Sequence, residues 1–263
     1  LFFFINLFLI QSQLVRETDP TAPVRILIKQ ERIFYLIGLG GIPILLSCYR
    51  FKFVSLIRLA YIYILYSFLS NLVEDALNII FKRPVKTLLD VGGNTGRFAL
   101  KTVSFNPDVQ VTIMDLPQQL GLMKNNIAGK QGADRIGGYP ANLLDASVPF
   151  PKGFDVIWMS QFLDCFSEEE VTSILSRAAT AMDPHTELYI LEAYWDRQQH
   201  ETGAYCLTQI SVYFTAMANG NSKMYYSGDM IKCVERAGLK VVDIYDNLGS
   251  GNSHTLFKVV INS

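Results

Sequence analysis

The chain has 263 residues, half of them hydrophobic, and a formal net charge of −1 at pH 7. This length suits one large domain, or one domain with an appendage. The near-neutral charge gives no global basic field that would attract nucleic acid, so we expect no nucleic-acid partner. The four cysteines form no CxxC pair, and His185, His200 and His254 form no HExxH arrangement. We therefore expect no metal site, and we expect these histidines in loops or on the surface.

The N-terminal part is unusually apolar, with runs at 1–10, 33–49 and 59–73. Charge interrupts each run before it reaches the roughly 20 residues that span a bilayer. Three interpretations stay open: core helices of a helical domain, a membrane-associated hairpin within residues 1–75, or sequence that is not native to the protein. The chain begins at Leu1 and its first methionine is Met114, which favours a fragment. We expect residues 1–78 to be a hydrophobic, helical region, truncated or non-native, and residues 79–263 to be a separate domain.

After residue 84 the pattern changes to alternating strands and helices. Short apolar runs predict buried parallel strands at 85–92, 109–115, 138–141, 187–195 and from 154 onward. Helices are predicted at 97–105, 120–128, 167–182, 202–218 and 227–238. Ser167 and Glu170 form a capping box at the start of the third helix, and Ser227 is the expected N-cap of the last. The segments 239–246 and 254–261 predict a closing antiparallel pair.

Five strands that alternate with helices indicate an α/β fold with a doubly wound, Rossmann-like parallel sheet. The C-terminal antiparallel hairpin brings this sheet to seven strands. Such a hairpin distinguishes the expected fold from that of a dinucleotide-binding domain.

The strongest motif is DVGGNTG, from Asp90 to Gly96, where a strand passes into a helix and open α/β sheets bind ligands. Gly92 and Gly93 allow a sharp turn and a close approach to a ligand. No glycine lies two residues before Gly93, so the motif is not GxGxxG and argues against NAD. It fits the acidic-x-Gly-x-x-x-Gly loop that cradles the methionine part of S-adenosyl-L-methionine, with Asp90 binding the ammonium group directly or through water. An ordinary glycine-rich turn is the alternative.

Further cofactor contacts are expected after the second and third strands. Asp115 ends the second strand, where its carboxylate can accept both ribose hydroxyls, and Leu116 follows it. Capping of a turn is the alternative role for this acid. After the third strand, a side-chain oxygen of Asn142 or Asp145 can accept a hydrogen bond from the adenine amino group, and we favour Asn142. Leu143 can pack on the adenine ring.

Four ordered segments, LLDVGGNTG, VTIMDLP, FLDCFSEEE and ELYILEAYWD, resemble the O-methyltransferase family that includes plant phenolic and bacterial polyketide methyltransferases. The resemblance covers residues 79–263. It implies a class I methyltransferase domain with S-adenosyl-L-methionine as cofactor, and Ser160 as a further cofactor contact. The family's N-terminal dimerisation and substrate-covering domain is not recognisable in residues 1–75, which leaves a homodimer as an expectation from the family alone.

One departure from the family concerns the catalytic base. Members that use a base carry His-Asp-Trp after the fourth strand, where this chain has Asp164, Cys165 and Phe166. An exposed aspartate has a pKa of about 3.9 and is a weak base, although burial would raise it. Either Asp164 acts as base or orienting group, or carbon ortho to an activated phenol is methylated, or the domain is a non-catalytic cofactor-binding scaffold. Glu192, at the end of the fifth strand, is the second catalytic candidate, and a simple strand-end charge is its alternative.

The segments FLDCFSEEE and YFTAMANGNSKMY are similar to methyltransferases of bacterial aryl-polyene pigment pathways. This similarity implies a small hydroxyaryl acceptor, phenolic or polyketide-like, with a carrier-protein-bound form as an alternative. Candidate substrate contacts are Tyr213, Phe214, Met217 and Asn219. An apolar stripe at helical spacing is equally compatible with a core position. We expect a cytoplasmic enzyme, with membrane association through residues 1–75 as the alternative.

Overall fold

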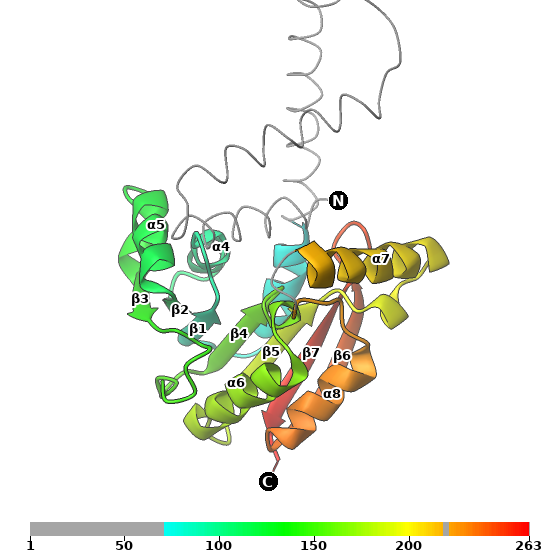
Figure 1. The fold of residues 1–263 in the computed structure, drawn as a ribbon. Coiled ribbons are helices and arrows are strands. Elements are labelled where there is room, and N and C mark those ends of the chain that lie inside the picture. The colour runs from blue at the N-terminus through cyan, green and yellow to red at the C-terminus, as the bar shows by residue number, and fades with distance from the viewer. Residues whose placement is uncertain (1–70, 218–220, 263) are drawn as a thin grey trace, which may run out of the picture. The chain divides into compact units, whose positions relative to one another are not determined.

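A seven-stranded sheet with helices on both faces organises the part of the chain that the computed structural model describes, residues 71–217 and 221–262 (Figure 1). The apolar runs before residue 71 and the substrate candidate Asn219 lie outside these described residues. A helix over residues 71–80 comes first. The domain boundary predicted between residues 78 and 79 falls within this helix and remains a prediction.

The sheet confirms the predicted topology. Its strands are β1 (Thr87–Val91), β2 (Gln110–Asp115), β3 (Ile136–Pro140), β4 (Val156–Ser160), β5 (Glu187–Glu192), β6 (Leu239–Leu248) and β7 (His254–Ile261). They are arranged in the order β3-β2-β1-β4-β5-β7-β6. The first five are parallel, and β7 lies antiparallel between β5 and β6. The fold is therefore α/β and Rossmann-like with a C-terminal antiparallel hairpin.

The helices begin and end within a few residues of their predicted bounds. They are α4 (Arg97–Phe105), α5 (Pro117–Ile127), α6 (Glu168–Ala181), α7 (Glu201–Met217) and α8 (Ser227–Arg236). Three short 3₁₀ turns lie between them, namely η2 (Ala133–Arg135), η3 (Leu163–Cys165) and η4 (Trp195–Arg197). Helix α5 begins three residues earlier than predicted, because Pro117 already has the backbone angle that a first helical residue needs.

The two predicted helix caps have different outcomes. The capping box is confirmed, because Ser167 Oγ accepts from Glu170 N at 3.3 Å and the Glu170 carboxylate accepts from Ser167 N at 2.8 Å. The prediction that Ser227 caps α8 is wrong, since Tyr226 is the N-cap and Ser227 is the first helical residue. Ser227 instead donates its hydroxyl to Asp196 at 2.5 Å, a long-range contact that local sequence does not reveal.

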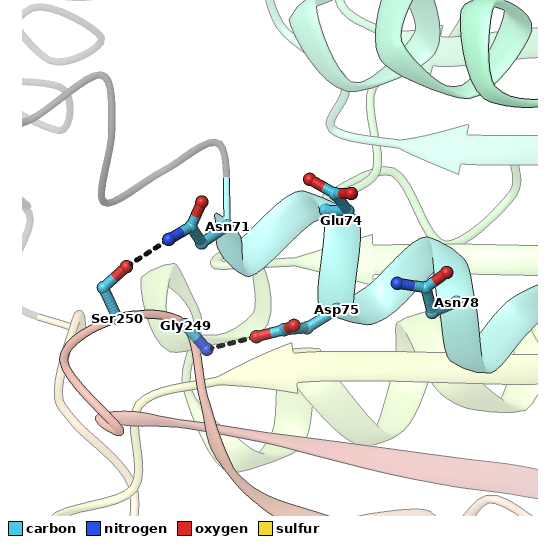
Figure 2. Close-up of a pocket in the computed structure, with 6 residues that line it drawn as sticks. All are labelled: Asn71, Glu74, Asp75, Asn78, Gly249 and Ser250. Atoms are coloured by element: carbon cyan, nitrogen blue, oxygen red, sulfur yellow. Dashed lines mark hydrogen bonds between the residues drawn. The ribbon is translucent and has the colours of Figure 1, made fainter.

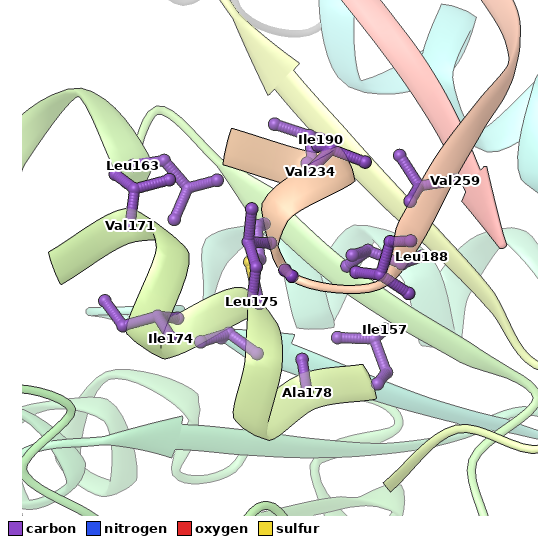
Figure 3. Close-up of a cluster of buried hydrophobic side chains, with 14 of the residues drawn as sticks. Ile157, Leu163, Val171, Ile174, Leu175, Ala178, Leu188, Ile190, Val234 and Val259 are labelled. Atoms are coloured by element: carbon purple, nitrogen blue, oxygen red, sulfur yellow. The ribbon is translucent and has the colours of Figure 1, made fainter. Parts of the chain in front are cut away.

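Both faces of the sheet are covered by apolar side chains. On one face, residues of α6 and α8 such as Leu175 and Val234 pack on Ile157 and Ile190 of the sheet (Figure 3). On the other face, the helix over 71–80 joins α4 and α5 in a second core cluster. Strands buried on both faces read as continuous apolar runs, which explains why β1 and β4 were recognisable. The carboxyl ends of the parallel strands are then the expected place for a ligand.

Candidate functional site

The glycine loop after β1 has the geometry of a cofactor cradle. Gly92 has φ of +72°, in the left-handed region, and its N–H donates to the Met114 carbonyl of β2 at 2.9 Å. A Cβ on Gly92 would overlap the ring of Phe162, and a Cβ on Gly93 would lie 2.5 Å from Asp90 Oδ2. Because neither position has room for a side chain, only glycine lets the loop pass this close to Phe162 and Asp90.

Asp90 fits the predicted ammonium contact. Its side chain is buried at the end of β1, and its Oδ2 atom has no hydrogen-bond partner within the described residues. Burial, with a contribution from the negative charge of Asp115, raises the pKa of Asp90 to about 8. A bound ammonium group would relieve both effects, since it would supply the missing hydrogen-bond donor and a positive charge.

Asp115 joins the end of β2 to the glycine loop. Its Oδ2 accepts from Asn94 N at 2.8 Å, and its Oδ1 accepts from Leu116 N at 2.7 Å. Each carboxylate oxygen can still accept one more hydrogen bond, as the predicted contact with two ribose hydroxyls requires. The structure thus brings Asp90 and Asp115 together at the carboxyl edge, although their ligand contacts remain proposals.

The predicted adenine contacts follow β3 at the same edge. Ala141 N donates to the Asp115 carbonyl at 2.9 Å, which ties this segment to β2. Asn142 is exposed, its Oδ1 accepting from the Leu144 backbone at 3.1 Å, whereas Leu143 is buried. Ser160 ends β4 and is partly buried. The structure is therefore compatible with these assignments, which remain predictions.

Two buried carboxyl groups lie at the ends of β4 and β5. Asp164 is in η3, Glu192 is the last residue of β5, and their exposed fractions are only 3% and 2%. Glu192 Oε1 accepts from the N–H groups of Phe162 and Leu163, both at 2.9 Å. One oxygen of each acid, Asp164 Oδ2 and Glu192 Oε2, is buried with no partner in the described chain. Such oxygens can accept a proton or a hydrogen bond from a ligand.

Burial changes the acid–base properties of this pair. It raises the pKa of Asp164 to about 7, and burial together with the charge of Asp164 raises the pKa of Glu192 well above its usual range. The Cys165 thiol donates to Asp164 Oδ1 at 3.5 Å. Two buried carboxylates in mutual repulsion favour a state that holds one proton near neutral pH. Asp164 is therefore not the weak, exposed base that its residue type alone suggests.

The candidate substrate residues belong to α7 and the segment after it. Tyr213, Phe214 and Met217 lie within this helix, and the contacts predicted for their side chains are outside what the structure describes. The helix is linked to the carboxyl edge through the segment that follows it. Ser211 Oγ of the helix accepts from Met224 N of that segment at 2.9 Å, and Ser222 Oγ of the same segment donates to the Cys165 carbonyl at 3.4 Å.

Sequence reasoning missed His254, which was expected in a loop or on the surface. It begins β7, where its Nε2 lies 2.9 Å from Gln161 Nε2 and its Nδ1 lies 3.0 Å from Ser253 Oγ. Burial lowers the pKa of His254 to about 4. The antiparallel pairing of β5 with β7 was the signal available, because it places the first residue of β7 at the carboxyl edge.

A surface hollow of about 290 Å³ lies between the helix over residues 71–80 and the turn from β6 to β7 (Figure 2). Its lining residues are Asn71, Glu74, Asp75, Asn78, Gly249 and Ser250. Asp75 accepts from Gly249 N at 2.9 Å, and Asn71 donates to Ser250 Oγ at 2.6 Å. None of the predicted site residues lines this hollow.

Within residues 71–217 and 221–262, no cluster of three or more His, Cys, Asp or Glu side chains is arranged to hold a metal ion. Over the same residues, no helix combines the length and the apolar character needed to cross a bilayer.

Comparison with known proteins gives consistent matches. The family model for the O-methyltransferase domain matches residues 55–239. Demethylspheroidene O-methyltransferase of Rhodobacter capsulatus is 27% identical over 170 residues, which cover 64% of this chain and 40% of that protein. O-methyltransferase SfmM3 of Streptomyces lavendulae is 24% identical over 181 residues, which cover 68% of this chain and 53% of that protein. The chain spans about half the length of these curated relatives.

Solved structures share the fold. The apo form of the S-adenosylmethionine-dependent methyltransferase SibL has a TM-score of 0.63 and 23% identity, covering 76% of this chain and 56% of that one. Mitomycin 7-O-methyltransferase MmcR has a TM-score of 0.61 and 18% identity, and the match covers 72% of this chain and 53% of that one. Since the family model matches well over half of the sequence, the chain belongs to the O-methyltransferase domain family of S-adenosylmethionine-dependent methyltransferases.

Proposed function

We propose that this domain transfers the methyl group of S-adenosylmethionine to the oxygen of a small hydroxyaryl compound, with Asp164 as the base. The observation that carries the proposal is the buried Asp164 carboxyl, whose Oδ2 has no partner within the described residues and whose pKa burial raises to about 7. It stands at the position where the resembled family carries a histidine.

The cofactor part of the proposal uses the loops at the ends of β1, β2 and β3. Asp90 would hold the ammonium group, while Asp115 would hold the ribose hydroxyls. The backbone from Gly92 to Gly96 would surround the methionine part, and further contacts would come from Leu116, Asn142, Leu143 and Ser160. When bound, S-adenosylmethionine supplies an electrophilic methyl group on a sulfonium sulfur. These residues hold it in a fixed orientation, which supplies proximity for a direct displacement.

Asp164 has the acid–base role. Asp164 Oδ2 would accept the proton of the acceptor hydroxyl, so that the acceptor oxygen would be free to take the methyl group that the bound cofactor supplies. A phenol has a pKa of about 10, so the transfer from phenol to a carboxyl of pKa about 7 is far less uphill than to an exposed aspartate. General base help of this kind contributes about 10²–10⁴-fold to rate.

Glu192 has a positioning role in this proposal. Its Oε1 binds the backbone N–H groups of Phe162 and Leu163, which fixes the turn that carries Asp164. The charge of ionised Asp164, together with burial, raises the pKa of Glu192, so Glu192 keeps its proton while Asp164 ionises. Burial and a fixed orientation together allow an aspartate to act as the general base, which an exposed aspartate would do poorly.

The acceptor class is supported by the relatives. An O-methyltransferase family 2 protein from Planctomyces limnophilus was crystallised with apigenin, and NcsB1 with S-adenosylmethionine and 2-hydroxy-5-methyl naphthoic acid. Apigenin and the naphthoic acid are both hydroxylated aromatic compounds. A carrier-bound acceptor, a homodimer, a cytoplasmic location and membrane association through residues 1–75 remain predictions from the sequence.

Carbon methylation is the second candidate. L-tyrosine C(3)-methyltransferase of Streptomyces lavendulae is 24% identical over 151 residues, which cover 57% of this chain and 40% of that protein. Its name states transfer to a ring carbon next to a phenol. In this chain a carboxylate base would then deprotonate the phenol while the ortho carbon attacks. The hydrogen on that carbon would leave as a proton and the oxygen would regain one, which restores the aromatic phenol.

The test uses the purified 263-residue chain with S-adenosylmethionine and a panel of hydroxyaryl compounds, including 2-hydroxynaphthoic acids. We expect the mass gain of one methyl group, and NMR of the product identifies the methylated atom. Asp164→Asn should reduce kcat by about 10²–10⁴-fold while leaving S-adenosylhomocysteine affinity within about two-fold. A folded wild-type chain that binds S-adenosylhomocysteine but methylates none of these compounds would contradict the proposal and favour the scaffold role.

A further inference from the structure

The turn that leaves β4 has a strained backbone residue. Gln161 has φ of +47°, in the left-handed region that residues other than glycine and asparagine rarely adopt. Its backbone N–H donates to the Leu191 carbonyl of β5 at 2.8 Å. Its side-chain Nε2 lies 2.9 Å from His254 Nε2, on the first residue of β7. A strained residue persists only where surrounding contacts hold it, and His254 provides such a contact.

This turn contacts the cofactor loop and also carries Asp164. Immediately after Gln161, the ring of Phe162 lies against Gly92 of the cofactor loop, so closely that a Cβ there would overlap it. The N–H groups of Phe162 and Leu163 donate to Glu192, and Asp164 is the next residue. A change in the backbone at Gln161 would therefore move the Phe162 ring and the Asp164 carboxyl together.

The hydrogen bonds of His254 define its chemical state. An amide N–H of Gln161 donates to Nε2, so the ring proton resides on Nδ1 and donates to Ser253 Oγ at 3.0 Å. Burial favours this neutral form by lowering the pKa of His254 to about 4. Both ring nitrogens are thus engaged within the protein. His254 is unsuited to act as the base itself, and its contacts instead hold a neighbouring turn.

We propose that His254 is a positioning residue for the methyl-transfer site: its hydrogen bond to Gln161 holds the left-handed turn that sets Phe162 against Gly92 and directs Asp164. The Asp164 part of this inference rests on the proposed function. The Phe162 part needs only cofactor binding, which can be measured without a methyl acceptor.

The test is a double-mutant cycle on the full chain with S-adenosylhomocysteine as the probe. His254→Leu removes the acceptor atom, Gln161→Ala removes the donor, and His254→Gln retains an acceptor at similar reach. We expect each of the first two to weaken S-adenosylhomocysteine binding by about 3–10-fold, as for loss of one hydrogen bond between neutral groups. The double variant should be no worse than either single variant, and His254→Gln should stay within about two-fold of wild type.

Several outcomes would overturn the inference. Effects of His254→Leu and Gln161→Ala that multiply would show that the two residues act independently. A lowered Tm with unchanged S-adenosylhomocysteine affinity would show that His254 only supports the sheet. If His254→Leu fails to fold, Gln161→Ala still removes the same hydrogen bond from the other side, and an unchanged affinity in that variant contradicts the inference. Coupled losses in a chain that methylates no acceptor would support the positioning role and contradict only the proposed function.

Discussion

Glu192 accepts a hydrogen bond from the backbone N–H of Leu163 at 2.9 Å, and this bond ties the end of β5 to the turn after β4. The same carboxylate oxygen accepts from Phe162, and Asp164 follows directly in the chain. One buried acid therefore fixes the backbone that presents the other. The pair is best treated as a unit, in which a change at either residue alters both the geometry and the charge of the other.

The rate of methyl transfer should depend on pH through Asp164. Because the base must be deprotonated and burial raises its pKa to about 7, kcat/KM should rise from pH 6 to pH 8 and level off above. Asp164→Asn should abolish this rise along with most of the rate. A wild-type profile that is flat across this range would rule out Asp164 as the titrating base.

Glu192→Gln provides a matched variant for the same measurement. The glutamine oxygen can still accept from the N–H groups of Phe162 and Leu163, so the turn is retained. Because Glu192 has the higher pKa of the pair and is protonated where Asp164 titrates, the neutral glutamine should leave the rise in kcat/KM near its wild-type pH. A clear shift of this rise to lower pH would show that Glu192 is ionised in this range and repels Asp164.

Stability should also respond to pH through this buried acid. The pKa of Asp164 is raised on folding, so its destabilising effect is absent below about pH 4 and develops as pH rises from about 4 to about 7. Asp164→Asn should therefore increase the free energy of unfolding by about 1–2 kcal/mol at pH 8 and change it little at pH 4. Urea unfolding at the two pH values measures this difference. Destabilisation at pH 8 would show that the ionised acid is satisfied in the folded chain.

Cofactor affinity should have its own pH dependence, which depends on Asp90. Burial raises the pKa of this carboxyl to about 8, while binding of an ammonium group requires its ionised form. The affinity for S-adenosylhomocysteine should increase from pH 6 to pH 7.5, with proton release detectable by calorimetry in buffers of different ionisation enthalpy. Asp90→Asn should weaken binding and remove the proton release. Equal proton release in wild type and variant would place the titrating group elsewhere.

Substitution of Gly92 should affect S-adenosylhomocysteine binding more than substitution of a glycine with a similar backbone angle elsewhere in the chain. Alanine at a left-handed position costs about 1–2 kcal/mol in either case. At Gly92 the added Cβ would also displace the Phe162 ring, whereas at Gly153, with φ of +87°, it meets nothing within 4 Å. We expect Gly92→Ala to weaken S-adenosylhomocysteine binding at least about ten-fold and Gly153→Ala to affect only stability. Comparable affinities in the two variants would contradict a cradle at Gly92.

Much of this fold could be predicted from the sequence because its signals are local. Apolar runs locate β1 and β4, the Ser167–Glu170 spacing defines the start of α6, and the glycines after Asp90 indicate the ligand loop. Each of these depends on neighbouring residues and on burial that periodicity already reveals.

The rest depends on contacts between distant segments. The left-handed Gln161 is stabilised by His254, 93 positions away, and Ser227 donates to Asp196 instead of capping its helix. The burial that raises the pKa of Asp164 results from packing of the β4 and β5 ends, which no residue pattern near Asp164 specifies. Sequence could name this acid but not its environment.

A crystal structure of the chain with S-adenosylhomocysteine would test the account at its centre. We predict that the amino group lies at Asp90, that the ribose hydroxyls lie at Asp115, and that the sulfur faces the unpartnered oxygens of Asp164 and Glu192. A ligand bound away from the Gly92–Gly96 backbone, or a sulfur screened from both acids by other side chains, would contradict it.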